Sequence, residues 1–147
     1  MPWYVDTSAF MKLAVAGAHS HEMRVWADAE EGRTGALWSP DLLRTEALRA
    51  ARRLSQEVLE ATRDRLDRMA FISITTDTYQ RAGELDQAVL RSLDALHLAA
   101  ALGLGDDLEG IVTYDERMTA ATTLWASRFS RRRTPAPDRN NEAGDAG

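Results

Sequence analysis

The first eight residues contain the pattern that most constrains the fold. Residues 3–5, Trp-Tyr-Val, form a short apolar run that ends at Asp6, and two small hydroxyl residues, Thr7 and Ser8, follow it. Such a run is typical of a strand buried on both faces, and an unpaired carboxylate is unfavourable in an apolar core. The pattern therefore predicts a central strand with Asp6 at its carboxyl end, the edge of an α/β sheet where ligands bind. At this site alone, an acid that only caps the following helix is the simpler interpretation.

A similar run near the other end of the chain favours a functional interpretation. Residues 111–114, Ile-Val-Thr-Tyr, precede Asp115, and residues 36–38 and 71–74 predict two more short strands. Segments with helical spacing of apolar residues lie between these runs. Because strands alternate with helices, the sequence predicts an α/β fold with right-handed βαβ units and a mostly parallel sheet.

Capping signals and apolar spacing predict the helix boundaries. Ser39 is expected to cap a helix with Pro40 in its first turn, and Gly32 is expected to end the helix before it. Apolar spacing predicts that Tyr79 and Leu93 point inward from their helices. The expected helices are residues 9–14, residue 20 to Gly32, Pro40 to residue 54, residues 55–69, a helix from residue 76, residues 93–102 and a helix from about residue 116.

The composition is that of one globular domain. The chain has 147 residues, of which 44% are apolar and 28% are charged. It contains no cysteine, which excludes disulfides and thiolate metal sites. No apolar run is long enough to span a membrane and no secretory signal is visible, so a cytoplasmic protein is expected. The net charge of −5 argues against a general nucleic-acid coat protein, but not against a nuclease whose carboxylates bind metal.

The composition changes at about Arg131. Three consecutive arginines, residues 131–133, precede a tail of Pro, Asp, Asn, Gly and Ala without an apolar anchor. A segment of this kind cannot bury enough apolar surface to offset its ordering entropy. We therefore expect a folded domain over residues 1–130 and a disordered tail over residues 131–147.

Two further acids lie on predicted helices beside apolar residues. Glu46 shares a helix with Leu43, and Asp94 lies in the first turn of the most apolar helix. If the first and fourth strands are neighbours, Asp6 and Asp115 lie at one sheet edge, near the helices that carry the other two acids. Four converging carboxylates repel one another and require a cation, and hard oxygen ligands select Mg²⁺ or Mn²⁺ over Zn²⁺. Such sites catalyse phosphodiester hydrolysis.

Four stretches resemble the motifs of PIN-domain nucleases, and more narrowly those of VapC-type toxins of bacterial toxin–antitoxin pairs. They are residues 4–8, 42–50, 92–99 and 112–118, they occur in the order of the family, and the resemblance extends to about residue 121. It implies a three-layer sandwich with a four- or five-stranded sheet flanked by helices.

The resemblance also implies the activity and the partners. The family is a group of Mg²⁺-dependent endoribonucleases, for which Mn²⁺ can substitute, and its members form homodimers that are inhibited by a small antitoxin. The antitoxin's C-terminal segment wraps around the toxin. By resemblance, the catalytic and metal-binding acids are Asp6, Glu46, Asp94 and Asp115, and the supporting hydroxyls are Thr113 and Ser8.

Some alternatives stay open at this stage. The family usually ends in a fifth edge strand, whereas residues 124–130 here read Leu-Trp-Ala-Ser-Arg-Phe-Ser. His97 follows Asp94 by three residues and is expected to be a structural histidine near the site, with a ligand or a proton carrier as the other roles. The RNA that is cut, whether transfer, ribosomal or messenger RNA, is not determined by the sequence.

Other classes of protein match less well. A receiver domain needs a late lysine, but Lys12 is the only lysine. A haloacid-dehalogenase-type phosphatase needs a second acid two residues after the first, where Ser8 stands. A PIN-like module that only binds RNA or a partner remains the non-enzymatic alternative, and the intact set of four acids argues against it.

Overall fold

A sheet of four short strands forms the centre of the computed structural model, which describes residues 1–85 and 90–124. The strands lie in the order β3-β2-β1-β4, and each pairing is parallel. The expected tail over residues 131–147, and any fifth strand beyond residue 124, lie outside the described residues. The strands are β1 (Trp3–Val5), β2 (Trp38–Pro40), β3 (Ala70–Ile72) and β4 (Gly110–Val112).

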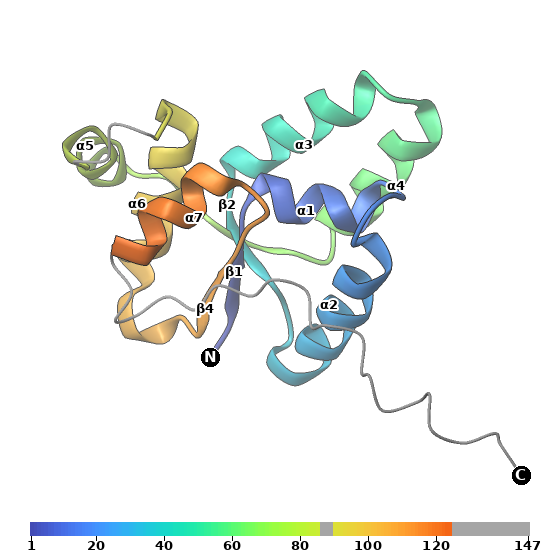
Figure 1. The fold of residues 1–147 in the computed structure, drawn as a ribbon, viewed down its shortest axis with the longest axis horizontal. Helices are drawn as coiled ribbons and strands as arrows, with labels where there is room; N and C mark the ends of the chain where they lie inside the picture. Colours follow the sequence, from blue (N-terminus) through green and yellow to red (C-terminus); the bar gives the residue numbers. More distant parts are fainter. Residues whose placement is uncertain (86–89, 125–147) are drawn as a thin grey trace, which may run out of the picture.

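Helices cover both faces of this sheet. Figure 1 shows α1 to α4 on one side of the strands and α5 to α7 on the other. The predicted alternation of strands and helices and the parallel sheet are therefore confirmed. The helices are α1 (Thr7–Ala14), α2 (Ser20–Thr34), α3 (Leu42–Arg52), α4 (Gln56–Leu66), α5 (Thr76–Glu84), α6 (Ser92–Leu104) and α7 (Glu116–Leu124), with a 3-10 turn, η1, at Gly105–Asp107.

The strand β1 is buried on both faces, as predicted. Because successive side chains of a strand point to opposite faces, Trp3 and Val5 pack into the core beneath α1 to α4, whereas Tyr4 packs into the core beneath α6 and α7. Gly110 of β4 pairs with Trp3 of the neighbouring strand β1, and a Cβ atom at Gly110 would lie 2.5 Å from the Trp3 ring. Close packing of the Trp3 indole against the start of β4 therefore requires glycine at position 110.

The expected helix start at Ser39 is wrong. Ser39 and Pro40 belong to β2, and α3 begins at Leu42. The Ser39 hydroxyl donates a hydrogen bond to the backbone oxygen of Val5 at 2.7 Å instead of capping a helix. A long-range partner in the neighbouring strand thus replaces the local capping interaction that the sequence suggested.

Two other expectations about the helices are also wrong. α2 continues through Gly32 to Thr34, and its C-cap is Gly35, whose φ of 90° suits glycine. Tyr79 and Leu93 do not point inward, since they are 57% and 47% exposed. α5 is buried at Ala82, a small residue that permits close packing on α6, and the buried part of α6 begins only at Ala95. No described helix has the length and hydropathy needed to cross a bilayer.

Candidate active site

The carboxyl ends of β1 and β4 bring two of the predicted acids into one region. Val5 pairs with Val112, and the backbone N–H of Asp6 donates to the oxygen of Val112. Asp6 follows β1 directly, and Thr113 and Asp115 follow β4 within three residues. Parallel pairing of the two strands therefore places their terminal polar residues at one edge, which meets the condition that the sequence analysis set for Asp6 and Asp115.

Asp6 caps α1 and also faces β4. Its Oδ1 accepts hydrogen bonds from the Ala9 N–H at 3.0 Å and from the Ser8 hydroxyl at 2.7 Å, and its Oδ2 accepts one from the Thr113 hydroxyl. The interpretation of Asp6 as a helix cap is therefore confirmed at Oδ1, while Oδ2 faces the residues that follow β4.

Asp6 is a buried acid. Its exposed fraction is 4%, and burial raises the pKa of its carboxyl above the usual value, although hydrogen bonds from Thr113, Ala9 and Ser8 counteract part of that increase. Desolvation disfavours the charged form of a carboxylate, and a nearby cation favours it. A positive charge beside Asp6 would therefore be strongly favourable.

Thr113 and Ser8 join the two strand ends. The Thr113 hydroxyl donates to Asp6 and accepts from the Asp115 N–H at 3.0 Å, while the Ser8 hydroxyl donates to Asp6 and accepts from the Tyr114 N–H at 2.9 Å. Each hydroxyl therefore uses one donor and one acceptor position to link β1 to the residues that follow β4. Both residues were predicted to support the site, and these contacts give a physical basis for that role.

Asp94 and Asp115 are bridged by a residue that the sequence analysis did not single out. The Arg117 guanidinium lies 3.6 Å from Asp115 Oδ2 and 4.0 Å from Asp94 Oδ2. Asp115 Oδ1 caps α7, accepting the N–H groups of Arg117 and Met118, and Asp94 accepts the Arg91 N–H at the start of α6. An arginine two residues after a strand-end acid was the available sequence signal for this bridge.

Glu46 is bound by a second group of residues, Thr7 and His97. Its Oε2 accepts hydrogen bonds from the Thr7 hydroxyl and from His97 Nε2, the latter at 2.7 Å. Burial raises the pKa of Glu46, but hydrogen bonds from His97 and Thr7 outweigh burial and place the pKa below its usual value. His97 is buried and also contacts the Tyr4 hydroxyl at 2.9 Å. The expectation of a hydrogen-bonded structural histidine near the acids is confirmed, whereas Tyr4 and Thr7 were missed.

The four acids are connected by side chains that donate hydrogen bonds or form ion pairs between them, and not by direct contact of their carboxylates. Thr113 links Asp6 to Asp115, Arg117 links Asp115 to Asp94, and Thr7, next to Asp6, binds Glu46. In the part of the chain that the structure describes, no three acidic or histidine side chains are arranged tightly enough to hold a metal ion as they stand. The donor set nevertheless fits a hard divalent cation, because it consists of carboxylate oxygens and already has a guanidinium between two of them.

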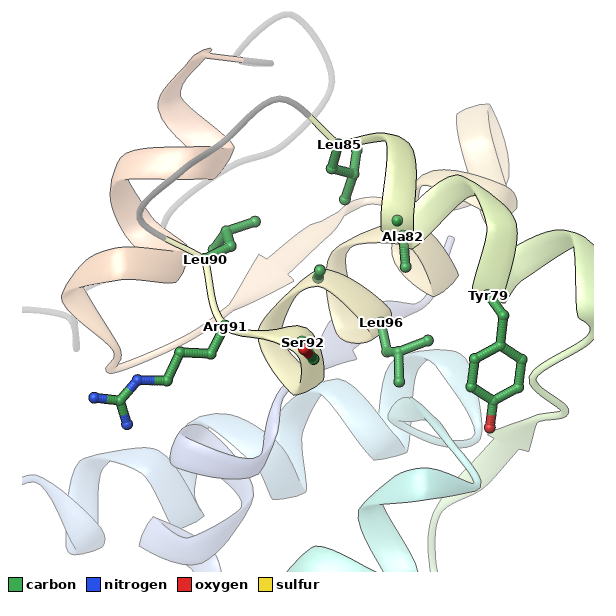
Figure 2. A pocket seen from close by; sticks show the side chains of 9 residues that line it. Tyr79, Ala82, Leu85, Leu90, Arg91, Ser92 and Leu96 are labelled. Atoms are coloured by element: carbon green, nitrogen blue, oxygen red, sulfur yellow. The ribbon is translucent and has the colours of Figure 1, made fainter.

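A hollow of about 480 Å³ lies between α5 and the first turns of α6. Figure 2 shows Leu85, Leu90 and Leu96 around it, with Tyr79 at one edge and the Arg91 side chain directed away from Tyr79. None of the four acids lines this hollow. The chemistry suggested by the carboxylates is therefore located at the strand ends and not in this apolar hollow.

Comparison with known proteins identifies the family. The chain matches the PIN domain family over residues 3–123. It is 36% identical over 116 residues to ribonuclease VapC47 of Mycobacterium tuberculosis strain CDC 1551 / Oshkosh, covering 78% of this chain and 85% of that protein. It is 37% identical over 122 residues to ribonuclease VapC46 of Mycobacterium tuberculosis strain ATCC 25618 / H37Rv, covering 82% of this chain and 91% of that protein.

A solved structure agrees with the fold. The crystal structure of Mycobacterium tuberculosis VapC20, described as a toxin that cleaves the sarcin–ricin loop, superposes with a TM-score of 0.63 at 20% identity and covers 81% of this chain and 94% of that one. This likeness supports the predicted α/β sandwich with a parallel sheet. The sequence matches, in addition, identify the family. The chain belongs to the PIN domain family and, within it, to the VapC ribonucleases.

Proposed function

We propose that this chain is a metal-dependent endoribonuclease that acts in the cytoplasm as the toxin of a toxin–antitoxin pair. The observation that carries the proposal is the meeting of Asp6 and Asp115 at the carboxyl ends of two paired parallel strands, with Thr113 between them. The curated relatives over most of the chain are named ribonucleases, which supports RNA as the substrate.

Four carboxylates would hold the divalent ion, Mg²⁺ with Mn²⁺ as a substitute. When bound, the ion would supply an activated water and stabilise the leaving oxygen of the phosphodiester. Burial of Asp6 and the guanidinium between Asp94 and Asp115 both support a cation at this position. The proposed metal ligands are Asp6, Glu46, Asp94 and Asp115.

The residues around the acids orient the proposed ligands. Ser8, Ala9 and Thr113 donate three hydrogen bonds to Asp6, which leaves its carboxylate little freedom to rotate. Thr7 and His97 both bind Oε2 of Glu46, so that Oε1 has no hydrogen-bond partner among the described contacts and is available to an ion or to a water. Because its pKa is lowered, Glu46 is ionised at neutral pH and can accept a hydrogen bond from that water.

The proposed partner is a small antitoxin that places a cation among the acids. Arg117 shows that the space between Asp94 and Asp115 accepts a guanidinium, and an arginine from a partner would compete with metal there. A complex structure that places the antitoxin arginine beside Asp94 is expected, and an acid edge left fully open would contradict this part of the proposal.

A homodimer, which the family resemblance implies, is also proposed. Trp26 is buried and packs edge-on against Trp3 with ring centroids 5.6 Å apart, so it does not contribute to a dimer surface. The exposed apolar side chains Tyr79 and Leu93, on α5 and α6, are better candidates. Light scattering at tens of micromolar, a rough choice set by typical affinities, is expected to show a dimer, and a monomer would contradict it.

RNA cleavage with matched variants tests the proposed function. The wild-type chain is expected to cut a panel of transfer, ribosomal and messenger RNA in Mg²⁺ and to be inactive in EDTA, whereas Asp94→Asn is expected to be inactive in both. Asp77→Asn is the control, because Asp77 is also an acid in the first turn of a helix, α5, and is outside the site. Cleavage by Asp94→Asn at the wild-type rate would contradict the assignment, and binding without cleavage by the wild type would favour a non-enzymatic module.

A further inference from the structure

A buried hydrogen-bonded chain runs from the central strand to Glu46. The hydroxyl of Tyr4, which is fully buried on β1, lies 2.9 Å from His97 Nδ1, and His97 Nε2 lies 2.7 Å from Glu46 Oε2. The Tyr4 and His97 rings meet edge to face at 6.1 Å. The Thr7 hydroxyl joins the end of the chain, since it donates to Glu46 and lies 3.1 Å from His97 Nε2.

The direction of each hydrogen bond follows from satisfying the buried groups. Tyr4 is fully buried, and a phenol hydroxyl carries its proton at neutral pH, so it is available as a hydrogen-bond donor. His97 Nδ1 is the one hydrogen-bond partner of that hydroxyl in the part of the chain that the structure describes. The buried O–H must therefore donate to Nδ1, since an unsatisfied buried donor is costly.

The tautomer of His97 is a consequence of that bond. If Nδ1 accepts a hydrogen bond, the proton of the neutral ring is on Nε2. The Nε2–H then donates to Glu46 Oε2, on the same oxygen that Thr7 binds. Two donors on one oxygen restrain the rotation of a carboxylate at the end of a flexible side chain, and the other oxygen is left available.

We propose that Tyr4 and His97 are positioning residues, which hold His97 as the Nε2–H tautomer and thereby aim Glu46 at the divalent ion. The proposal rests on the proposed function, in which Glu46 is one of the metal-binding acids. It assigns a role to a tyrosine of the hydrophobic core that touches neither the ion nor the RNA. Partners of this kind around metal ligands affect metal affinity because they fix the ligand's orientation.

Calorimetric titration with Mn²⁺ alone tests the proposal without a substrate. His97→Ala is expected to weaken Mn²⁺ binding by about tenfold or more, and Tyr4→Phe by about threefold, because it removes one hydroxyl and leaves the ring in the core. His97→Gln is expected to recover most of the affinity lost in His97→Ala, since its amide can still donate to Glu46.

Two controls separate positioning from a general loss of structure. Thr62→Val removes another buried hydroxyl, which bonds the Val58 carbonyl within α4, and is expected to leave Mn²⁺ affinity unchanged. In a Glu46→Gln background, Tyr4→Phe is expected to have no further effect on affinity, because its influence passes through the Glu46 carboxylate. A structural role of Tyr4 would lower affinity equally in both backgrounds and would overturn the proposal.

The imidazole ¹⁵N resonances of His97 provide a readout that needs no metal. The wild type is expected to show the proton on Nε2, and Tyr4→Phe a mixture of tautomers. A proton on Nδ1 in the wild type overturns the proposal whatever the titrations show. If Glu46→Gln and the His97 and Tyr4 variants all bind Mn²⁺ like the wild type, the positioning role is also refuted. If the wild type itself binds no Mn²⁺, the metal dependence in the proposed function fails, and the positioning role fails with it.

Discussion

Replacing Thr113 by valine tests whether one hydroxyl joins the two acid-bearing strand ends. Valine keeps the shape of threonine, so the packing around position 113 is preserved while the hydroxyl is lost. The substitution removes the donor to Asp6 Oδ2 and the acceptor of the Asp115 N–H. Asp6 is almost fully buried, so water does not readily replace the lost donor.

The magnitude follows from these two contacts. A hydrogen bond to a charged group contributes about 1.5–3 kcal/mol, and an unsatisfied buried donor costs about 1–3 kcal/mol. The Asp115 N–H is only partly buried and can reach water, so its contribution is near the lower limit. We therefore expect Thr113→Val to lower the free energy of unfolding by roughly 2–4 kcal/mol. Thr113→Ser, which keeps the hydroxyl, should lose only about 1 kcal/mol.

Urea denaturation in EDTA measures both variants. The difference between the wild type and Thr113→Val should depend on pH, because losing the donor raises the pKa of Asp6 in the folded state further. The difference in the free energy of unfolding is fully present at a pH above the folded-state pKa of Asp6 in both proteins. It narrows as the pH falls through these two pKa values, because Asp6 then becomes protonated in both proteins. A loss in Thr113→Val no larger than that in Thr113→Ser, or a difference that grows toward acid, would refute the reasoning.

Three further predictions concern Arg117, Gly110 and the tail. Arg117→Gln should raise Mn²⁺ affinity by about threefold in calorimetry, because the ion no longer has to displace a guanidinium from two partly exposed acids. Arg81→Gln, which removes an exposed ion pair with Asp77, is the control and should leave Mn²⁺ affinity unchanged. Gly110→Ala should lower the free energy of unfolding by about 1–3 kcal/mol in urea, since the new Cβ would overlap the Trp3 ring, and an unchanged midpoint would contradict the packing described. A chain truncated before Arg131 should stay soluble and cut RNA, and loss of either property in a sedimentation or cleavage assay would show that the tail is required.

The elements that were predicted well have strong local signals. β1 was recognised because a continuous apolar run needs burial on both faces, and Asp6 because a carboxylate ends such a run. Ser39 and Pro40 were misassigned because their local capping signal is genuine, but the Ser39 hydroxyl has a stronger partner in a strand that is distant in the sequence. Tyr79 has helical spacing with the apolar residues of α5 but is exposed. Periodicity shows which face of a helix is apolar, but it does not show how much of that face a neighbouring helix covers.

The position of Asp6 and Asp115 at strand ends was predictable from the sequence, but the contacts that connect the four acids were not. Strand ends and helix starts show where acids lie, and the strand order then places Asp6 beside the residues that follow β4. The bond from Tyr4 to His97 joins residues 93 positions apart, and only the packing of α6 on β1 creates it. Arg117 was missed for a similar reason, since its bridge to Asp94 depends on the relative placement of α6 and α7.

Thermal unfolding with and without Mn²⁺ tests the central claim that the acids form a metal site. For the wild type, free Mn²⁺ at about 100 times its Kd should stabilise the fold by roughly 2.7 kcal/mol, which raises the Tm by roughly 10 °C for a chain of this size. Asp94→Asn keeps an oxygen that can accept the Arg91 N–H, so its Tm in EDTA should stay close to that of the wild type, while its gain from Mn²⁺ should disappear. An equal Mn²⁺-dependent rise in both proteins, or a Tm of Asp94→Asn far below the wild type in EDTA, would show that Asp94 is structural and would contradict the account.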